Sequence, residues 1–68
     1  MIVKWCYTYI SVESGNLLVF GADDRDSAVT SLFRCLHGHE RYRTNGRLLR
    51  IELTDDFSQV VSTTFEAP

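Results

Sequence analysis

Residues 23–38, DDRDSAVTSLFRCLHG, carry the clearest helical pattern of this 68-residue chain and decide its fold. Apolar residues recur there at spacings of three and four and form one stripe: Ala28, Val29, Leu32, Phe33, Cys35 and Leu36. Asp23 or Asp24 can accept hydrogen bonds from the amides of the first helical turn. Gly38 suits a left-handed C-terminal cap. The pattern predicts a helix over residues 24–37.

Strands are predicted on both sides of this helix. β-Branched and aromatic residues fill 2–12 and 17–22, and the turn residues of 13–16 join them into a hairpin. Residues 47–54 alternate, with Leu49, Ile51 and Leu53 on one face and Leu48 and Arg50 on the other. Residues 58–65 form a weaker fourth strand. The polar stretch 39–46 reads as a loop that Asn45-Gly46 closes as a turn.

The predicted order is therefore β-β-α-β-β in a single α+β domain covering residues 1–68, with 65–68 frayed. One helix must bury its stripe on one face of the sheet, which gives two layers. A right-handed crossover places the third strand beside the first. We expect an antiparallel four-stranded sheet in the order 2-1-3-4.

Composition points to a folded chain, since 44% of the residues are apolar and 24% are charged. No apolar run approaches the roughly 18 residues that span a bilayer, and the first residues lack a secretory signal pattern. Both features predict a cytoplasmic protein. Cys6 and Cys35 are too few for a disulfide scaffold and are expected to be reduced, small apolar residues. A bridge from the first strand to the helix is the alternative.

The first candidate site is a set of aromatic side chains in the first strand. Alternate residues of a strand point to opposite faces of the sheet. Trp5, Tyr7 and Tyr9 therefore share one face (one parity), and Ile2, Cys6 and Ile10 share the other. If the aliphatic parity meets the helix, the three aromatic residues line the uncovered face of the sheet, with Arg50 and Leu48 nearby. Such a face could bind protein or stack unpaired bases. The sequence leaves open which parity faces the helix, and buried aromatic residues are the alternative.

The second candidate site is a basic segment. The net charge of −2 conceals five arginines between Arg34 and Arg50, against a single acid, Glu40. Partner contacts are predicted for the cationic and aromatic side chains of its second half: Arg41, Tyr42, Arg43, Arg47 and Arg50. Arginine pairs well with phosphate or carboxylate groups. The sequence pI of 5.5 is low for a nucleic-acid-binding domain, so a protein surface is favoured, and a solvated loop is the alternative.

Catalytic and metal sites are not predicted. Cys35, His37 and His39 are two residues apart, so side chains on a helix would point in nearly opposite directions instead of converging on a metal. The carboxylates of 23–26 are explained by the helix start. The chain has no Gly-rich phosphate loop and no nucleophile elbow. We therefore expect no enzyme activity, no metal and no cofactor.

The hairpin, the Asp-rich turn Ala22-Asp23-Asp24-Arg25-Asp26, the helix opening Ser27-Ala28-Val29 and the return strand together resemble compact proteins encoded by phages and mobile elements. Small anti-CRISPR proteins and phage inhibitors of host polymerase belong to this class. The likeness is topological and covers residues 1–54, so it assigns no residue a role. It implies a stoichiometric inhibitor that occupies a functional surface of a host complex.

The leading hypothesis is a non-enzymatic protein-binding module, such as an inhibitor of a CRISPR effector or another host complex. Its predicted contact residues are Trp5, Tyr7, Tyr9, Arg41, Tyr42, Arg43, Arg47 and Arg50. The first alternative is a single-stranded nucleic-acid module in which Tyr7, Tyr9 and Arg50 stack or pair on the strand. The second is a subunit that forms homodimers or larger homo-oligomers through an edge strand or the aromatic face. No membrane partner is expected.

Overall fold

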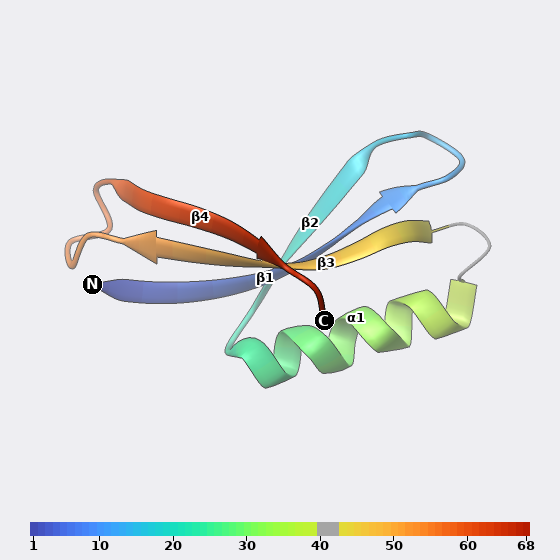
Figure 1. The fold of residues 1–68 in the computed structure, drawn as a ribbon, viewed down its shortest axis with the longest axis horizontal. Helices are drawn as coiled ribbons and strands as arrows, with labels where there is room; N and C mark the ends of the chain where they lie inside the picture. Colours follow the sequence, from blue (N-terminus) through green and yellow to red (C-terminus); the bar gives the residue numbers. More distant parts are fainter. Residues whose placement is uncertain (40–42) are drawn as a thin grey trace.

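The computed structural model describes residues 1–39 and 43–68, apart from the side chains of 37–39, 43 and 44. Its elements are, in chain order, β1 (Ile2–Ser11), β2 (Leu17–Ala22), α1 (Arg25–His39), β3 (Arg43–Leu53) and β4 (Val60–Glu66). The strands form one sheet in the order β2-β1-β3-β4, with antiparallel neighbours throughout (Figure 1). The predicted α+β fold and strand order are confirmed.

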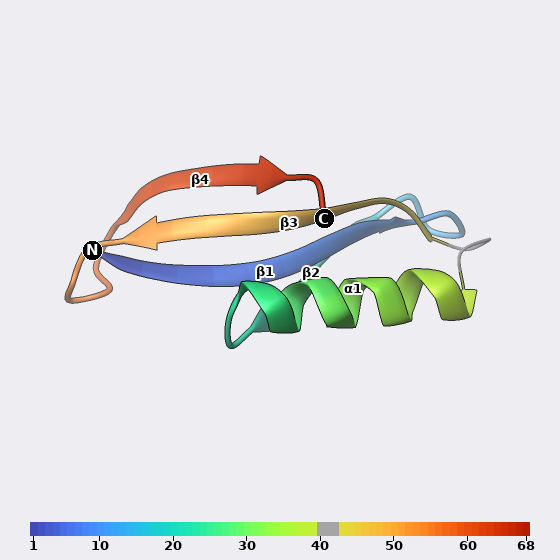
Figure 2. The same ribbon diagram turned by 60° about the horizontal axis from the view of Figure 1, so that its bottom comes forward.

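The helix lies on one side of the sheet and covers only part of its length. It packs on β1 and β3, with a smaller contact to β2. Figure 2 shows α1 under the half of the sheet that ends in the β1–β2 hairpin, while the half that ends in the β3–β4 hairpin extends past it. The Cα atoms span 39 × 23 × 15 Å with a radius of gyration of 12.7 Å. A compact chain of this length has a radius of about 11 Å, so the molecule is thin and elongated.

The start of α1 follows the predicted capping pattern. Asp24 Oδ1 accepts a 2.7 Å hydrogen bond from the Ser27 amide, and the first helical bond joins the Ala28 amide to the Asp24 carbonyl. The bond from the Ser27 amide also lowers the pKa of Asp24. The predicted end is wrong, because α1 continues through Gly38 to His39. Glycine in a helix costs only about 1 kcal/mol, so a glycine near the end does not by itself fix the last residue.

The core between α1 and the sheet is small. The buried apolar side chains of the described residues are Tyr9, Ala28, Leu32 and Leu48, and partly buried ones pack around them: Trp5, Tyr7, Leu18, Ala22, Val29, Cys35 and Leu36. The predicted helical stripe is therefore largely confirmed. Phe33 departs from it with 42% of its surface exposed, because a step of about 100° per residue turns it away from the line of Leu32.

The third strand begins earlier than predicted and contains the predicted turn. β3 starts at Arg43, so Asn45 and Gly46 lie inside a strand and not in a loop. The pairing of β1 with β3 shifts there, with one residue of β1, Tyr9, set against two of β3, Asn45 and Gly46. Asn45 has a φ of 56°, so the left-handed conformation implied by Asn-Gly is present, but in a β-bulge. A Cβ on Gly46 would lie 2.7 Å from Leu36 Cδ1, which explains the glycine.

Candidate functional site

The aromatic residues of β1 face α1. Tyr9 is only 5% exposed, and Trp5 and Tyr7 pack against the same core cluster as Leu32. The Arg25 guanidinium lies 5.9 Å from the centre of the Trp5 ring. The prediction that these three aromatic residues line the uncovered face is therefore wrong. The physical reason is their size: large rings gain most from burial, and the aromatic parity supplies the larger area.

The opposite parity forms the uncovered side of the sheet, which we call the open face. Directly paired residues of neighbouring strands share a face, so the pairing register identifies its members. Its apolar residues are Ile2, Cys6, Ile10, Leu17, Val19, Leu49, Ile51, Leu53, Val60 and Phe65. Its other described residues are Lys4, Thr8, Gly21, Arg47 and Thr63. The open face is thus predominantly apolar.

The margins of the open face are accessible, while its middle is shielded by neighbouring side chains. Leu17 and Val19 on β2 are 53% and 49% exposed, and Val60 and Phe65 on β4 are both 57% exposed. Cys6 on the central strand is half-buried. Single exposed apolar residues are ordinary, but a contiguous set on one face is characteristic of an interaction surface.

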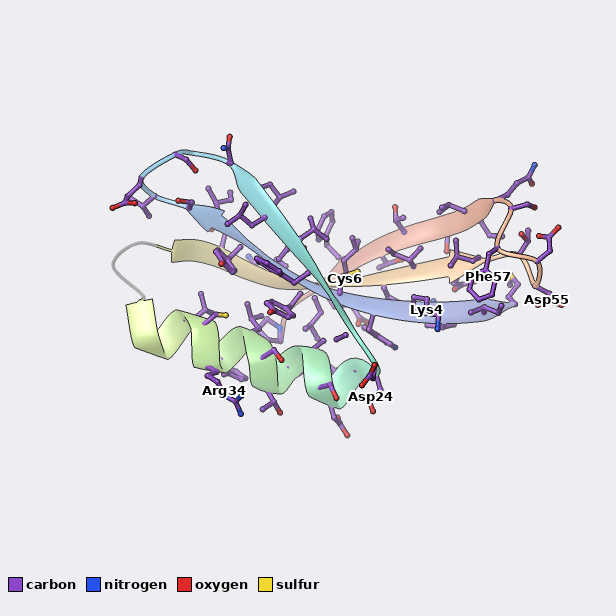
Figure 3. The ribbon with its side chains drawn as sticks, turned by 180° about the vertical axis from the view of Figure 1, so that it is seen from behind. Lys4, Cys6, Asp24, Arg34, Asp55 and Phe57 are labelled. Atoms are coloured by element: carbon purple, nitrogen blue, oxygen red, sulfur yellow. The ribbon has the colours of Figure 1, made fainter. Side chains whose placement is uncertain are left out.

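Charge on the open face is sparse and of one sign. Its described charged residues are Lys4 and Arg47, which come from neighbouring strands. Lys4 Nζ lies 5.9 Å from the centre of the Phe57 ring, and Figure 3 shows the two side chains together near the β3–β4 hairpin. The Arg47 guanidinium donates to the Gly46 carbonyl at 2.8 Å. The buried Thr8 hydroxyl donates to the Arg47 carbonyl at 3.3 Å.

The loop after β3 extends this surface with an exposed aromatic ring. Phe57 is 59% exposed and has a φ of 62°, a left-handed conformation that a bulky residue rarely adopts. Asp56 fixes the loop by accepting hydrogen bonds from the Thr54 hydroxyl at 2.7 Å and the Ser58 amide at 3.0 Å. Hydrogen bonds from Ser58, followed by the one from Thr54, lower the pKa of Asp56 to about 2. A rigid, hydrogen-bonded turn therefore holds Phe57 at the surface.

The predicted basic site is divided by the structure. Arg47 lies on the open face, whereas Arg50 lies on the helix side and pairs with Glu52. Arg41 and Tyr42 lie outside the described residues, and Arg43 is the first residue of β3, with a side chain that is likewise outside the description. Among the predicted contact residues whose side chains are described, Arg47 lies on the open face and the others lie on the helix side.

The two cysteines lie on different sides of the sheet. Cys6 belongs to the open face, and Cys35 of α1 packs against the core on the other side. Neither of these described residues forms a disulfide. The alternative of a bridge from the first strand to the helix does not fit this fold, because the sheet separates the two thiols. Among the described residues, no three His, Cys, Asp or Glu side chains could hold a metal ion; the side chains of His37 and His39 lie outside this description.

The outer strands present a second accessible feature. β4 is exposed along most of its length, and from Val60 to Phe65 it contains neither a charged residue nor proline. β2 at the other edge also has no charged residue. Natural proteins usually protect edge strands with such residues, so both edges could accept another strand.

Sequence reasoning missed the open face, although a signal for it was present. Both parities of β1 are apolar, and Leu48 and Leu49 are consecutive apolar residues on opposite faces of β3. Apolar residues on both parities are typical of strands that are covered on both faces. With a single helix in the predicted fold, that pattern indicated that one apolar face would have no helix over it.

Comparisons with known proteins add no relatives to this description. No protein-family model, no curated protein and no solved structure matches the chain. In the described part of the chain, no helix has the length and apolar character needed to cross a membrane. The chain is a small α+β domain with a helix on one face of its sheet and an apolar open face on the other.

Proposed function

We propose that this chain is a non-enzymatic protein-binding module whose open face docks onto another polypeptide chain. The observation that supports this proposal is the contiguous apolar surface formed by one parity of all four strands. Apolar area is the main source of affinity in most protein association. The open face also has the shape that such docking needs, because it is a sheet without a covering helix.

The chemistry of the open face favours a protein over other partners. Its middle is aliphatic, and its cations, Lys4 and Arg47, are four register positions apart. A complementary partner surface is therefore predominantly apolar and leaves these two cations near water. Arg47 keeps its predicted role as a contact residue in this proposal.

The nucleic-acid alternative loses the stacking surface that it requires. Tyr7 and Tyr9 stack on Phe20 with ring centres 5.1 and 5.7 Å away, and Tyr9 is buried beneath α1. Arg50 is engaged by Glu52. Rings that are buried or already stacked on a neighbour offer less surface to a base, so these contacts favour a protein partner. The resemblance to phage-encoded inhibitors stays a prediction about which protein the open face binds.

The proposal is tested by co-purification of the tagged chain from its natural host. The wild-type chain is expected to carry a stoichiometric polypeptide, either a second copy or a different protein. Leu49→Asp, in the middle of the open face, should remove it, because a carboxylate cannot be buried against apolar groups without a partner. Thr30→Asp on the exposed side of α1 is the matched control and should retain it. Retention of the polypeptide by Leu49→Asp, with native circular dichroism, would refute the proposal.

A further inference from the structure

We infer that the polypeptide bound by the open face is a second copy of this chain, stacked face to face about a two-fold axis. This inference rests on the proposed function and names its partner. The product is a sandwich of two four-stranded sheets with one helix on each outer side. Such sheet packing places the two layers about 10 Å apart with their strands within about 30° of each other.

The first argument is the small amount of burial that one copy achieves. The helix and sheet enclose four buried apolar side chains among the described residues, while an equal number of apolar side chains on the open face are about half exposed: Leu17, Val19, Val60 and Phe65. A domain of about 60 residues already buries only about 60% of its unfolded surface and is marginally stable. A partner that is always present, at the same concentration as the chain itself, provides the missing burial most directly.

The second argument is area. β1 and β3 run the full length of the sheet, β2 covers one end and β4 the other, so the face is about three strands wide on average. With a strand spacing of about 4.8 Å and a rise of about 3.3 Å over the paired residues, its projected area is about 430 Å². Two such faces have a projected area of about 860 Å² together, and protruding side chains add accessible area, so two copies reach the scale of about 1,000 Å² that a specific interface requires.

The third argument is self-complementarity. The row of the open face at Cys6 runs through Gly21, Leu49 and Phe65, so small and large side chains stand next to one another. Side-chain size rises across this row from Gly21 on β2 to Phe65 on β4. A two-fold axis parallel to the strands sets the small side of one face against the large side of the other, so two identical faces can interlock. Lys4 is four register positions away from the row of Arg47, which corresponds to about 13 Å, so a two-fold axis can stack the faces without placing cation on cation.

Pairing of two copies through their edge strands is the competing arrangement. It would satisfy the edge of β4 by main-chain hydrogen bonds, and β4 is exposed. However, edge pairing extends the sheet sideways and leaves the exposed margins of the open face, such as Leu17 and Phe65, in water. Stacking covers that face, so burial favours stacking over edge pairing.

The purified chain alone tests this inference. Sedimentation equilibrium from micromolar to millimolar concentration should show a monomer–dimer transition. Phe65→Glu places an acid at a 57% exposed position, where folding of the monomer is insensitive to it. Because a two-fold interface contains the substitution twice, the dissociation constant should rise at least about 100-fold. Thr30→Glu on α1 is the control, and its dissociation constant should stay within about threefold of the wild-type value.

A photoreactive benzoylphenylalanine in place of Phe65 should link two copies on illumination, and the same group at Thr30 should not. The Cys6 thiol provides an independent reading: its alkylation rate should fall as the dimer forms, in a Cys35→Ser background. A chain that remains monomeric at millimolar concentration overturns this inference but leaves the proposed function intact if the host co-purification yields a different protein. A dimer that survives Phe65→Glu unchanged also overturns it, and indicates edge pairing.

Discussion

Leu48 and Leu49 test the assignment of the two faces, because they are adjacent on β3 and point to opposite sides of the sheet. Leu48 is 0% exposed beneath α1, whereas Leu49 is half-buried on the open face. Leu48→Ala should destabilise the chain by about 3 kcal/mol, within the range for fully buried leucines. The whole domain is expected to have a stability of about 3–10 kcal/mol, so this loss is a large fraction of it. Leu49→Ala should cost the monomer only about 1 kcal/mol, because its side chain already contacts water.

Urea denaturation at a dilute and a concentrated condition separates the two effects. Trp5 is the single tryptophan and lies beside α1, so its fluorescence reports on the helix–sheet contact. The loss caused by Leu48→Ala should be the same at both concentrations. The loss caused by Leu49→Ala should grow with concentration, because association stabilises the folded state by mass action. If Leu49→Ala costs as much as Leu48→Ala in dilute solution, the open face is part of the core and the assignment is wrong.

Further predictions concern the bulge and the β3–β4 loop. Gly46→Ala should destabilise the fold by about 1–2 kcal/mol in thermal or urea unfolding, because its Cβ would meet Leu36, whereas Gly21→Ala, with no atom within 4 Å, should be nearly neutral. The pKa of Asp56 is lowered to about 2 from 3.8, so its carboxylate stabilises the fold above pH 4, and this contribution is lost as the pH falls toward 2. Asp56→Asn should therefore flatten the acid unfolding profile between pH 4 and 2; an unchanged profile would contradict the loop network. Phe57→Gly should raise the unfolding midpoint by relieving about 1 kcal/mol of left-handed strain and should weaken dimerisation, whereas a lower midpoint would contradict the strain.

Local sequence patterns were sufficient for the elements and their order. The bounds of β2 at Leu17–Ala22 follow directly from the turn residues before it and the Asp-rich segment after it. The cap of α1 is Asp24, one of the two aspartates that the sequence offered for this role. These features depend on residues within a few positions of one another, and the right-handed crossover then leaves few topologies to consider.

Which face of β1 packs against α1 could not be predicted in the same way. Trp5, Tyr7 and Tyr9 alternate with Cys6 and Ile10, so both faces of the strand are apolar, and periodicity gives no preference. The choice depends on contacts across the sheet, such as the space that Gly46 leaves for the helix. The Asn45-Gly46 dipeptide illustrates the same limit, because its backbone conformation was predictable but its place inside a strand was set by the pairing with β1.

A strand that needs only one cover alternates between apolar and polar residues, and β1 departs from that rule along its length, as β3 does at Leu48 and Leu49. On the helix side, Tyr9 and Leu48 are buried by α1. On the other side, Cys6, Leu49 and Ile51 repeat an apolar pattern and are half-buried, with no helix of the described residues packed over them. Polar residues at these positions would leave the helix-side contacts unchanged and make the monomer more soluble. Under the inference of a stacked second copy, a second sheet covers this side of β1 and β3, as α1 covers Tyr9 and Leu48 on the other.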